Sequence, residues 1–187
     1  ISIRLVGSEM CIRDSIRVDF NVPLEKGRVT DTTRIKSAVP TILKIIKDGG
    51  ACILMSHLGR PNGFEDQFSL IQIKSELDKI LKMETKFCTD CVGPIAEEMS
   101  QKLLMGEVLL LENLRFYSEE TKGDVGFSKK LSQHASCYVN DAFGTAHRAH
   151  ASTTVVAKYF ENKFYGKLLE KEVLALKKVM SNGASPI

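Results

Sequence analysis

Short β-rich runs alternate with longer stretches of helical periodicity through most of this sequence, and that alternation limits the folds open to it. Five strands are predicted, at residues 16–20, 51–55, 85–88, 108–111 and 137–140. The second and fourth (ACILM and VLLL) are continuously apolar, as strands covered on both faces are. Strands separated by helical segments indicate βαβ units and a parallel sheet, so the predicted fold class is α/β.

Helices are predicted between the strands, at residues 32–47, 70–81, 95–104 and 127–133. Their ends carry recognisable signals: Gly49 and Gly50 follow the first helix, Ser69 can cap the second, and Pro94 stands where the third would begin. An apolar stripe at residues 168–180 predicts a further long helix. The predicted architecture is therefore a Rossmann-like parallel sheet with helices on both faces.

The two ends of the chain stand apart from this pattern. Residues 1–15 (ISIRLVGSEMCIRDS) have neither strand nor helix periodicity and resemble translated sequencing adapter, so we expect a non-native, disordered leader. A genuine disordered tail or a poor first strand is the alternative. The sequence stops soon after the last predicted helix, where another strand could start, and we expect it to be truncated there.

Composition argues against several classes of partner. The 26 basic and 23 acidic residues leave a formal charge of +3, which gives no reason to expect nucleic acid or a membrane surface as partner. No apolar run has the length of a membrane span, and the start lacks the features of a secretory signal. Five cysteines, an odd number, with Cys52 and Cys137 in apolar strands, fit a reducing compartment. We expect a cytoplasmic protein in which any anion site is local.

Basic side chains follow the strands at the points where the strands end. Three of the loops carry an arginine (Arg60, Arg115 and Arg148), and Arg34 lies after the first strand. Ligands of open parallel sheets bind beyond the carboxyl ends of the strands. Arginine donates two parallel hydrogen bonds to phosphate or carboxylate and keeps its charge, so this convergence predicts a site for a small polyanion.

Single residues in these loops also have simpler interpretations. A lone arginine is more often a surface group, and His57, His147 or His150 alone is more often structural than catalytic. The His147-x-x-His150 and Cys88-x-x-Cys91 pairs each lack the further ligands of a zinc site, so no metal is predicted. Neither G-x-x-x-x-G-K-[ST] nor G-x-G-x-x-G occurs, so no nucleotide site is predicted in this chain.

Four motifs resemble the phosphoglycerate kinase family, in the family's order: RVDFNVP at 17–23, SHLGRP at 56–61, ENLRF at 112–116 and NDAFGTAHRAHAST at 140–153. With TRIKSAVPTI at 33–42 and KFCTDCVGP at 86–94, the resemblance covers nearly all of residues 16–187. It implies an N-terminal, 3-phosphoglycerate-binding domain at 16–165. Residues 166–187 would then be an interdomain helix, truncated before the nucleotide-binding domain.

The resemblance also implies an activity. The family transfers a phosphoryl group between 1,3-bisphosphoglycerate with ADP and 3-phosphoglycerate with Mg-ATP, and its members are usually monomeric. Mg-ATP or ADP would be bound by the missing domain, with no cofactor or metal held by this chain. The fragment alone is therefore expected to have no turnover.

Individual roles follow from the same resemblance. Asp19 and Asn21 would contact the hydroxyl and the carboxyl end of the glycerate. Arg34 would be catalytic, because it would reach the carboxyl end and steady the phosphoryl group in flight. The phosphate that is not transferred would be held by His57, Arg60, Arg115 and Arg148.

Five further residues complete the implied site. Phe20, Leu58 and Gly59 lie within the matching motifs and are included among the substrate-binding residues. Arg17 and His150 would belong to the same basic patch, with a secondary role.

Two other functions stay open from the sequence. A non-catalytic module could use the same arginines to bind a phosphorylated metabolite. A small phosphatase or mutase would need a nucleophile that faces the arginines. Ser56 and Cys137 are candidates by position, although both are expected to pack or cap.

Overall fold

The computed structural model describes residues 13–145 and 148–181. Its main feature is a six-stranded sheet in the order β5-β6-β4-β1-β7-β8, in which neighbouring strands are parallel. The strands are β1 (Arg13–Arg17), β4 (Ala51–Met55), β5 (Lys86–Phe87), β6 (Val108–Leu110), β7 (Cys137–Asn140) and β8 (Asn162–Tyr165). The predicted α/β fold with a parallel sheet is confirmed.

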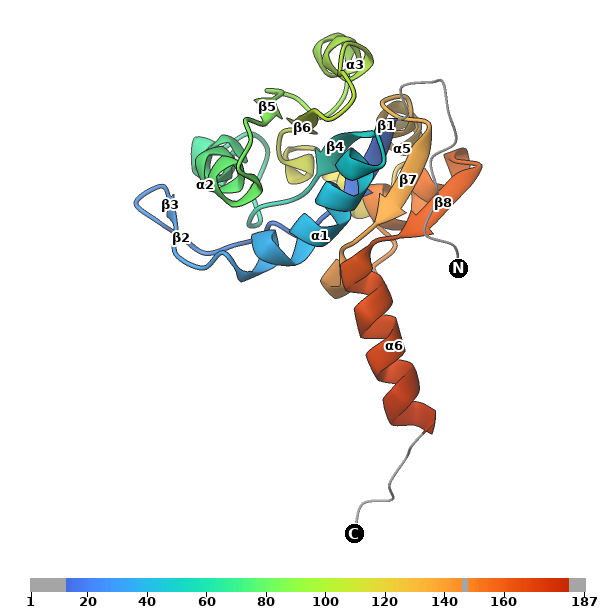
Figure 1. Cartoon of the computed structure of the whole chain (residues 1–187). Helices are drawn as coiled ribbons and strands as arrows, with labels where there is room; N and C mark the ends of the chain where they lie inside the picture. Colours follow the sequence, from blue (N-terminus) through green and yellow to red (C-terminus); the bar gives the residue numbers. More distant parts are fainter. Residues whose placement is uncertain (1–12, 146–147, 182–187) are drawn as a thin grey trace.

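Helices cover both faces of the sheet (Figure 1). Helices α1 (Thr33–Lys47) and α2 (Ile71–Leu81) pack on one face, and α3 (Pro94–Gln101) and α5 (Val125–Ser132) pack on the other. Successive side chains of β4 alternate between the two cores: Cys52 and Leu54 join the first, and Ile53 and Met55 join the second. The side chains of β4 are buried in the two cores in turn, which explains the continuous apolar run that the sequence shows there.

The predicted helices are present, with ends that shift by a few residues. Helix α3 begins at Pro94, where the missing N–H of proline costs no hydrogen bond. Helix α1 continues through Pro40 without a break. A short helix, α4 (Ser118–Lys122), precedes α5 and was not predicted.

Strand β1 begins at Arg13, inside the segment that the sequence assigned to a disordered leader. Asp14 pairs with Cys52 and Cys137, and Ser15 pairs in the same way with the next residue of each neighbouring strand. Backbone pairing on both sides therefore places these polar residues in the centre of the sheet despite their low strand propensity. Residues 1–12 of the expected leader lie outside the described residues. Within 13–15 the alternative of a poor first strand describes the structure.

The last strand and a small hairpin have no counterpart in the prediction. Strand β8 extends the sheet beyond β7, and its side chains are mostly exposed. Strands β2 (Leu24–Glu25) and β3 (Arg28–Val29) form a small antiparallel hairpin. The sequence does predict a short helix after Thr153, through Val156 and Phe160. In the structure, Ala151–Val155 form a turn of π-helix that continues into a 3₁₀ turn, Val156–Tyr159.

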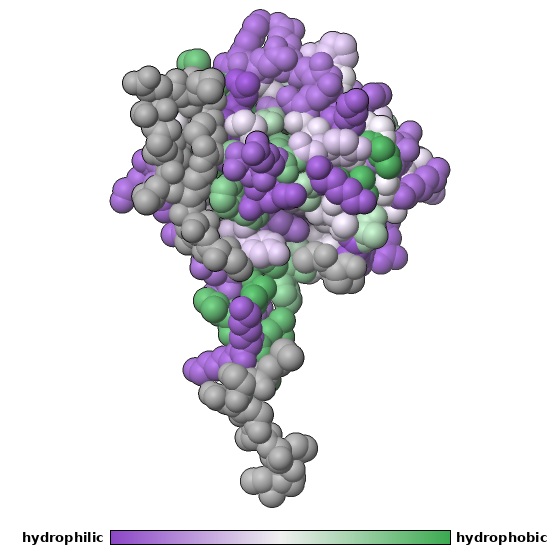
Figure 2. Space-filling view, turned by 90° about the vertical axis from the view of Figure 1, so that its right-hand side faces the viewer, coloured by the Kyte–Doolittle hydropathy of each residue, from purple (hydrophilic) through white to green (hydrophobic). Residues whose placement is uncertain are grey.

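Helix α6 (Lys167–Ser181) projects away from the sheet (Figure 1). Its first turn is held by Asp141, whose Oδ1 accepts hydrogen bonds from the backbone N–H groups of Leu168 (3.0 Å) and Leu169 (3.2 Å). The hydroxyl of Thr41 accepts a third, from the N–H of Lys167 (2.9 Å). Farther along, hydrophobic residues lie on the helix surface (Figure 2). Among the described residues, no helix combines the length and apolar character needed to cross a membrane.

Candidate anion-binding site

A cavity of about 300 Å³ lies beyond the carboxyl ends of β1, β4, β6 and β7. Its walls come from the loops that follow these four strands and from the start of α1. The lining residues are Asp19, Asn21, Arg34, His57, Gly59, Arg60, Arg115, Gly144, Thr145 and Arg148. The four arginines singled out from the sequence thus face one space.

The loop after β1 supplies the acidic and amide groups of the cavity. Asp19 accepts a hydrogen bond from the N–H of Asn21 through Oδ1 (3.2 Å), and its Oδ2 is paired with Arg34. The Asn21 side chain in turn accepts a hydrogen bond from the N–H of Gly59 (2.8 Å). Since each group is held by a neighbour, one side of the cavity has a fixed set of donors and acceptors.

Gly59 is required at its position for two reasons. Its φ of +63° is unfavourable for residues with a side chain, and an added Cβ would overlap the ring of Phe68. Its carbonyl oxygen accepts a hydrogen bond from Nη1 of Arg115 (2.6 Å). The N–H of Gly59 therefore joins the loop after β4 to the loop after β1, and the C=O of Gly59 joins it to the loop after β6.

Positive charge is concentrated around His57. This side chain is 4% exposed, and burial, followed by the charges of Arg17, Arg115 and Arg148, lowers its pKa from 6.5 to about 2. Burial, followed by the charges of Arg148 and Arg17, also lowers the pKa of Arg115. Cationic groups that destabilise one another's charge in this way are stabilised by an anion placed between them.

A second polar cavity, of about 680 Å³, adjoins the first and shares three arginines with it: Arg60, Arg115 and Arg148. His150 lines this second cavity and not the first. Arg17 lines neither, because its side chain is buried behind His57 and bonded to it. The two residues assigned a secondary role are therefore beside and behind the main cavity.

Phe20 and Leu58, which the sequence reading placed in the site, have their side chains in the hydrophobic core and do not line the cavity. Both alternate with polar neighbours along their loops, and the apolar member of each pair turns inward. Gly144 and Thr145 line the cavity and were not singled out. Their position inside the NDAFGTAHRAHAST stretch was the available signal.

The nucleophile candidates do not face the arginines. Ser56 is fully buried, and its Oγ accepts a hydrogen bond from the N–H of Phe20 (2.8 Å) and donates to the carbonyl of His57 (3.4 Å). Cys137 begins β7, at the end of the strand opposite the cavity. Neither residue can act on an anion bound at the arginines, so this geometry opposes the phosphatase or mutase interpretation.

The cysteine and histidine pairs show no metal-binding arrangement in residues 13–145 and 148–181, where no three potential ligands come together. Cys88 and Cys91 are buried as free thiols, and burial raises the pKa of each. His147 lies outside the described residues, so its pair with His150 has no structural account.

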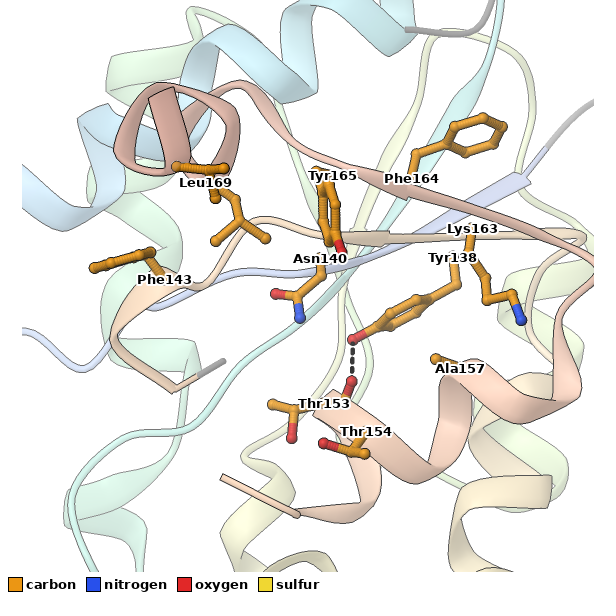
Figure 3. Close-up of a pocket in the computed structure, with 11 residues that line it drawn as sticks. Tyr138, Asn140, Phe143, Thr153, Thr154, Ala157, Lys163, Phe164, Tyr165 and Leu169 are labelled. Atoms are coloured by element: carbon orange, nitrogen blue, oxygen red, sulfur yellow. Dashed lines mark hydrogen bonds between the residues drawn. The ribbon is translucent and has the colours of Figure 1, made fainter. Parts of the chain in front are cut away.

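A mainly apolar cavity of about 660 Å³ lies between β7, β8, the π-helical turn and α6 (Figure 3). Tyr138, Phe143, Tyr165 and Leu169 contribute to its walls, and the Tyr138 hydroxyl donates a hydrogen bond to the carbonyl of Thr153 (3.2 Å). The charged residue in its lining is Lys163. This chemistry does not suit a polyanion, which leaves the arginine-lined cavity as the candidate site.

Known proteins that are similar to this chain share one family. The family model described as "Phosphoglycerate kinase" matches residues 13–187. A phosphoglycerate kinase of Moorella thermoacetica is 51% identical over 172 residues, which cover 91% of this chain and 44% of that protein. One from Gloeobacter violaceus is 49% identical over 176 residues, with 94% and 43% covered. The chain thus spans less than half the length of the curated relatives it matches.

Solved structures give the same result. The phosphoglycerate kinase of Pyrococcus horikoshii superposes with a TM-score of 0.85 at 33% identity, covering 94% of this chain and 45% of that one. The enzyme of Coxiella burnetii gives a TM-score of 0.82 at 36% identity, with 91% and 43% covered. Sequence motifs, sheet topology and these similarities together establish that the chain belongs to the phosphoglycerate kinase family.

Proposed function

We propose that this chain supplies the 3-phosphoglycerate site of a phosphoglycerate kinase. The observation that carries the proposal is the convergence of Arg60, Arg115 and Arg148 with His57 on one cavity that also holds a fixed carboxylate and amide. A ligand with a phosphate at one end and a hydroxyl and carboxylate at the other matches that division of charge. Its size also suits a cavity of about 300 Å³.

Within this proposal, the three arginines and His57 bind the phosphate that stays on the substrate. Asp19 and Asn21 orient the hydroxyl and carboxyl end. Arg34 lies at the rim, half exposed and paired with Asp19, so it can turn toward a phosphoryl group that arrives from outside the cavity. Catalysis by such a residue is electrostatic, because phosphoryl transfer spreads negative charge over the equatorial oxygens in the transition state.

The nucleotide is proposed to bind elsewhere, in the part of the family's proteins that this chain does not match. The absence of glycine-rich phosphate loops from the sequence and the coverage of less than half of the relatives support this assignment. Positioning two substrates side by side supplies most of the rate in such reactions. The chain alone should therefore bind phosphoglycerate without turning it over. We propose that it is cytoplasmic and monomeric and that its ligands are small molecules.

Calorimetric titration of the chain tests the proposal, with 3-phosphoglycerate as ligand and inorganic phosphate and Mg-ATP as controls. We expect 3-phosphoglycerate to bind much more tightly than phosphate, and Mg-ATP not to bind. A folded chain that binds 3-phosphoglycerate no better than phosphate would contradict the proposal.

A second measurement separates the kinase from a non-catalytic binding module. The part of the Moorella thermoacetica relative that this chain does not match is expressed separately and mixed with this chain, and phosphoryl transfer from ATP to 3-phosphoglycerate is followed. Recovery of activity that is lost with Arg34→Ala supports the kinase. Tight binding of phosphoglycerate without any recovery, by a chain that associates with that half, favours the module.

A further inference from the structure

A buried chain of hydrogen bonds lies directly behind the cavity. It starts at Glu120 on α4, passes through Ser152 in the π-helical turn and Arg17 at the end of β1, and ends at His57 in the loop after β4. Each of these four side chains is less than 5% exposed. The first three residues do not line the cavity, and among them only Arg17 was assigned any role from the sequence.

The direction of each hydrogen bond is fixed by chemistry. A guanidinium can only donate, and Arg17 donates from Nε to the hydroxyl of Ser152 (2.8 Å) and from Nη1 to the carbonyl of Val18. The Ser152 hydroxyl must then give its own proton to Glu120 (2.5 Å), whose other oxygen accepts from the N–H of Ser152 (3.0 Å). The buried positive charge of Arg17 is thus balanced by the buried carboxylate through one serine hydroxyl.

The last bond of the chain determines the state of His57. Nη2 of Arg17 lies 3.1 Å from Nδ1 of His57. Because Arg17 has no lone pair to offer, Nδ1 must be the acceptor and cannot carry a proton. The proton of the neutral ring is therefore on Nε2, which makes no hydrogen bond to the described residues and belongs to a side chain that lines the cavity.

We propose that Glu120, Ser152 and Arg17 are positioning residues that hold His57 as a neutral donor, with its Nε2–H directed toward the bound anion. In this arrangement the arginines supply the charge of the site, and His57 supplies a hydrogen bond of fixed direction that does not change with pH in the neutral range. The part that concerns bound phosphate rests on the proposed function, whereas the tautomer is a property of the free chain.

Nitrogen NMR of the intact chain labelled with ¹⁵N in its histidine rings tests the tautomer directly. The signals of His57 are assigned by their loss in His57→Gln. At pH 7 we expect the shift of an unprotonated, pyridine-type nitrogen at Nδ1 and of a protonated, pyrrole-type nitrogen at Nε2. A proton on Nδ1, or an imidazolium, would overturn the proposal.

Variants then test the chain behind the ring. Ser152→Ala breaks the link between Arg17 and Glu120, so a second population of His57 protonated on Nδ1 should appear, while Ser152→Thr keeps the hydroxyl and the original spectrum. Glu120→Gln removes the counter-charge and should act in the same direction if Ser152→Ala does not fold.

The matched control is Ser100→Ala, because Ser100 is an equally buried serine bonded to Nδ1 of His134 (3.0 Å). It should change the signals of His134 and leave those of His57 unchanged.

Binding distinguishes the two proposals. Ser152→Ala should weaken 3-phosphoglycerate binding about 3- to 10-fold, the effect of one misdirected hydrogen bond, and Ser152→Thr should restore it. An unchanged His57 spectrum in folded Ser152→Ala and Glu120→Gln would overturn the positioning role. If the spectra change as expected and the unsubstituted chain does not bind phosphoglycerate, the positioning role stands and the proposed function fails.

Discussion

The side chain of Asn113 is joined to the backbone of Leu58 by two hydrogen bonds of opposite direction. Its Oδ1 accepts from the N–H of Leu58 (3.2 Å), and its Nδ2 donates to the carbonyl of Leu58 (2.8 Å). The same amide also accepts from the N–H of Arg115 (3.0 Å) and donates to the carbonyl of Phe68 (2.9 Å). One fully buried residue therefore fixes the loops that carry Arg60 and Arg115 relative to each other.

Replacing this residue should damage both stability and the site. Asn113→Ala leaves four backbone groups without their partner, two of them buried and two partly buried, so we expect the free energy of unfolding to fall by about 2–4 kcal/mol. Urea unfolding measures the loss. Asn162→Ala, an exposed change on β8, is the control and should stay within about 0.5 kcal/mol of the unsubstituted chain. A similar result for both variants would show that the amide does not hold the loops.

Ser15 should respond in the opposite direction. Its hydroxyl is buried in the central strand and has no hydrogen-bond partner among the described residues. Ser15→Ala removes a polar group that loses its hydration on folding, so we expect a gain of about 1 kcal/mol. Ser100→Ala is the contrast, because the hydroxyl of Ser100 bonds to the carbonyl of Ala96 (2.6 Å) and to His134, and its loss should destabilise the chain. A loss of stability on Ser15→Ala would mean that its hydroxyl is hydrogen-bonded after all.

Apolar periodicity was sufficient to predict the parts of the sheet that are buried on both faces. β4 was predicted with its observed bounds because all five of its residues are apolar and buried, which gives a continuous signal. β8 was missed because an edge strand with exposed side chains (NKFY) carries no such signal. The start of β1 was missed for a different reason, since Asp14 and Ser15 are polar and only their pairing with both neighbours places them in the sheet.

The residues of the site also divide into those that the sequence predicts and those that it does not. Arginines after strand ends can be read from the sequence, because parallel strands bring their carboxyl ends to one edge. Glu120 and Ser152 cannot, since neither follows a strand and their relation to Arg17 exists only once α4 and the π-helical turn have packed together. Asn113 falls between these cases: it follows β6 directly, but its role is to hold backbone and not to face the cavity.

The stability of the chain should fall as the pH is lowered from 7 to 5. Burial and neighbouring arginines lower the pKa of His57 from 6.5 to about 2, and burial lowers the pKa of His134. As the pH falls through about 6.5, these histidines therefore bind protons in the unfolded chain and stay unprotonated in the folded chain. The free energy of unfolding is therefore highest above that pH and decreases below it. His57 contributes up to about 1.4 kcal/mol of this decrease per pH unit.

Urea unfolding at pH 7, 6 and 5 measures this dependence. His57→Gln should reduce the change in unfolding free energy per pH unit by the amount expected for one proton, because glutamine does not titrate. Asp141 has a pKa raised by burial and acts in the opposite sense at lower pH, so the series ends at pH 5. Equal slopes with and without His57 would show that the ring titrates normally in the folded chain.

Two leucines of α6 should differ sharply in their contribution to the free energy of unfolding. Leu169 is 4% exposed and lines the apolar cavity, whereas Leu176, seven residues farther along the helix, is 51% exposed. Leu169→Ala should cost about 2–4 kcal/mol of unfolding free energy, and Leu176→Ala should stay within about 0.5 kcal/mol. Thermal unfolding distinguishes them. Comparable losses would indicate that the far part of α6 is covered by other atoms in solution.

Arg148 provides the most direct test of the site. It lines both polar cavities and stands with Arg60 and Arg115 where the phosphate of the substrate is proposed to bind. Arg148→Ala should weaken 3-phosphoglycerate binding by about 2 kcal/mol, because it removes a charge-assisted pair that water replaces only in part. Arg148→Lys keeps the charge without the planar fork, so it should recover only part of the loss. Calorimetric titration gives both values, and the control Arg28→Ala, on the exposed hairpin, should bind as the unsubstituted chain does. If affinity is unchanged in Arg148→Ala while the chain remains folded, the phosphate binds elsewhere on the arginine rim, and the next variant to measure is Arg60→Ala.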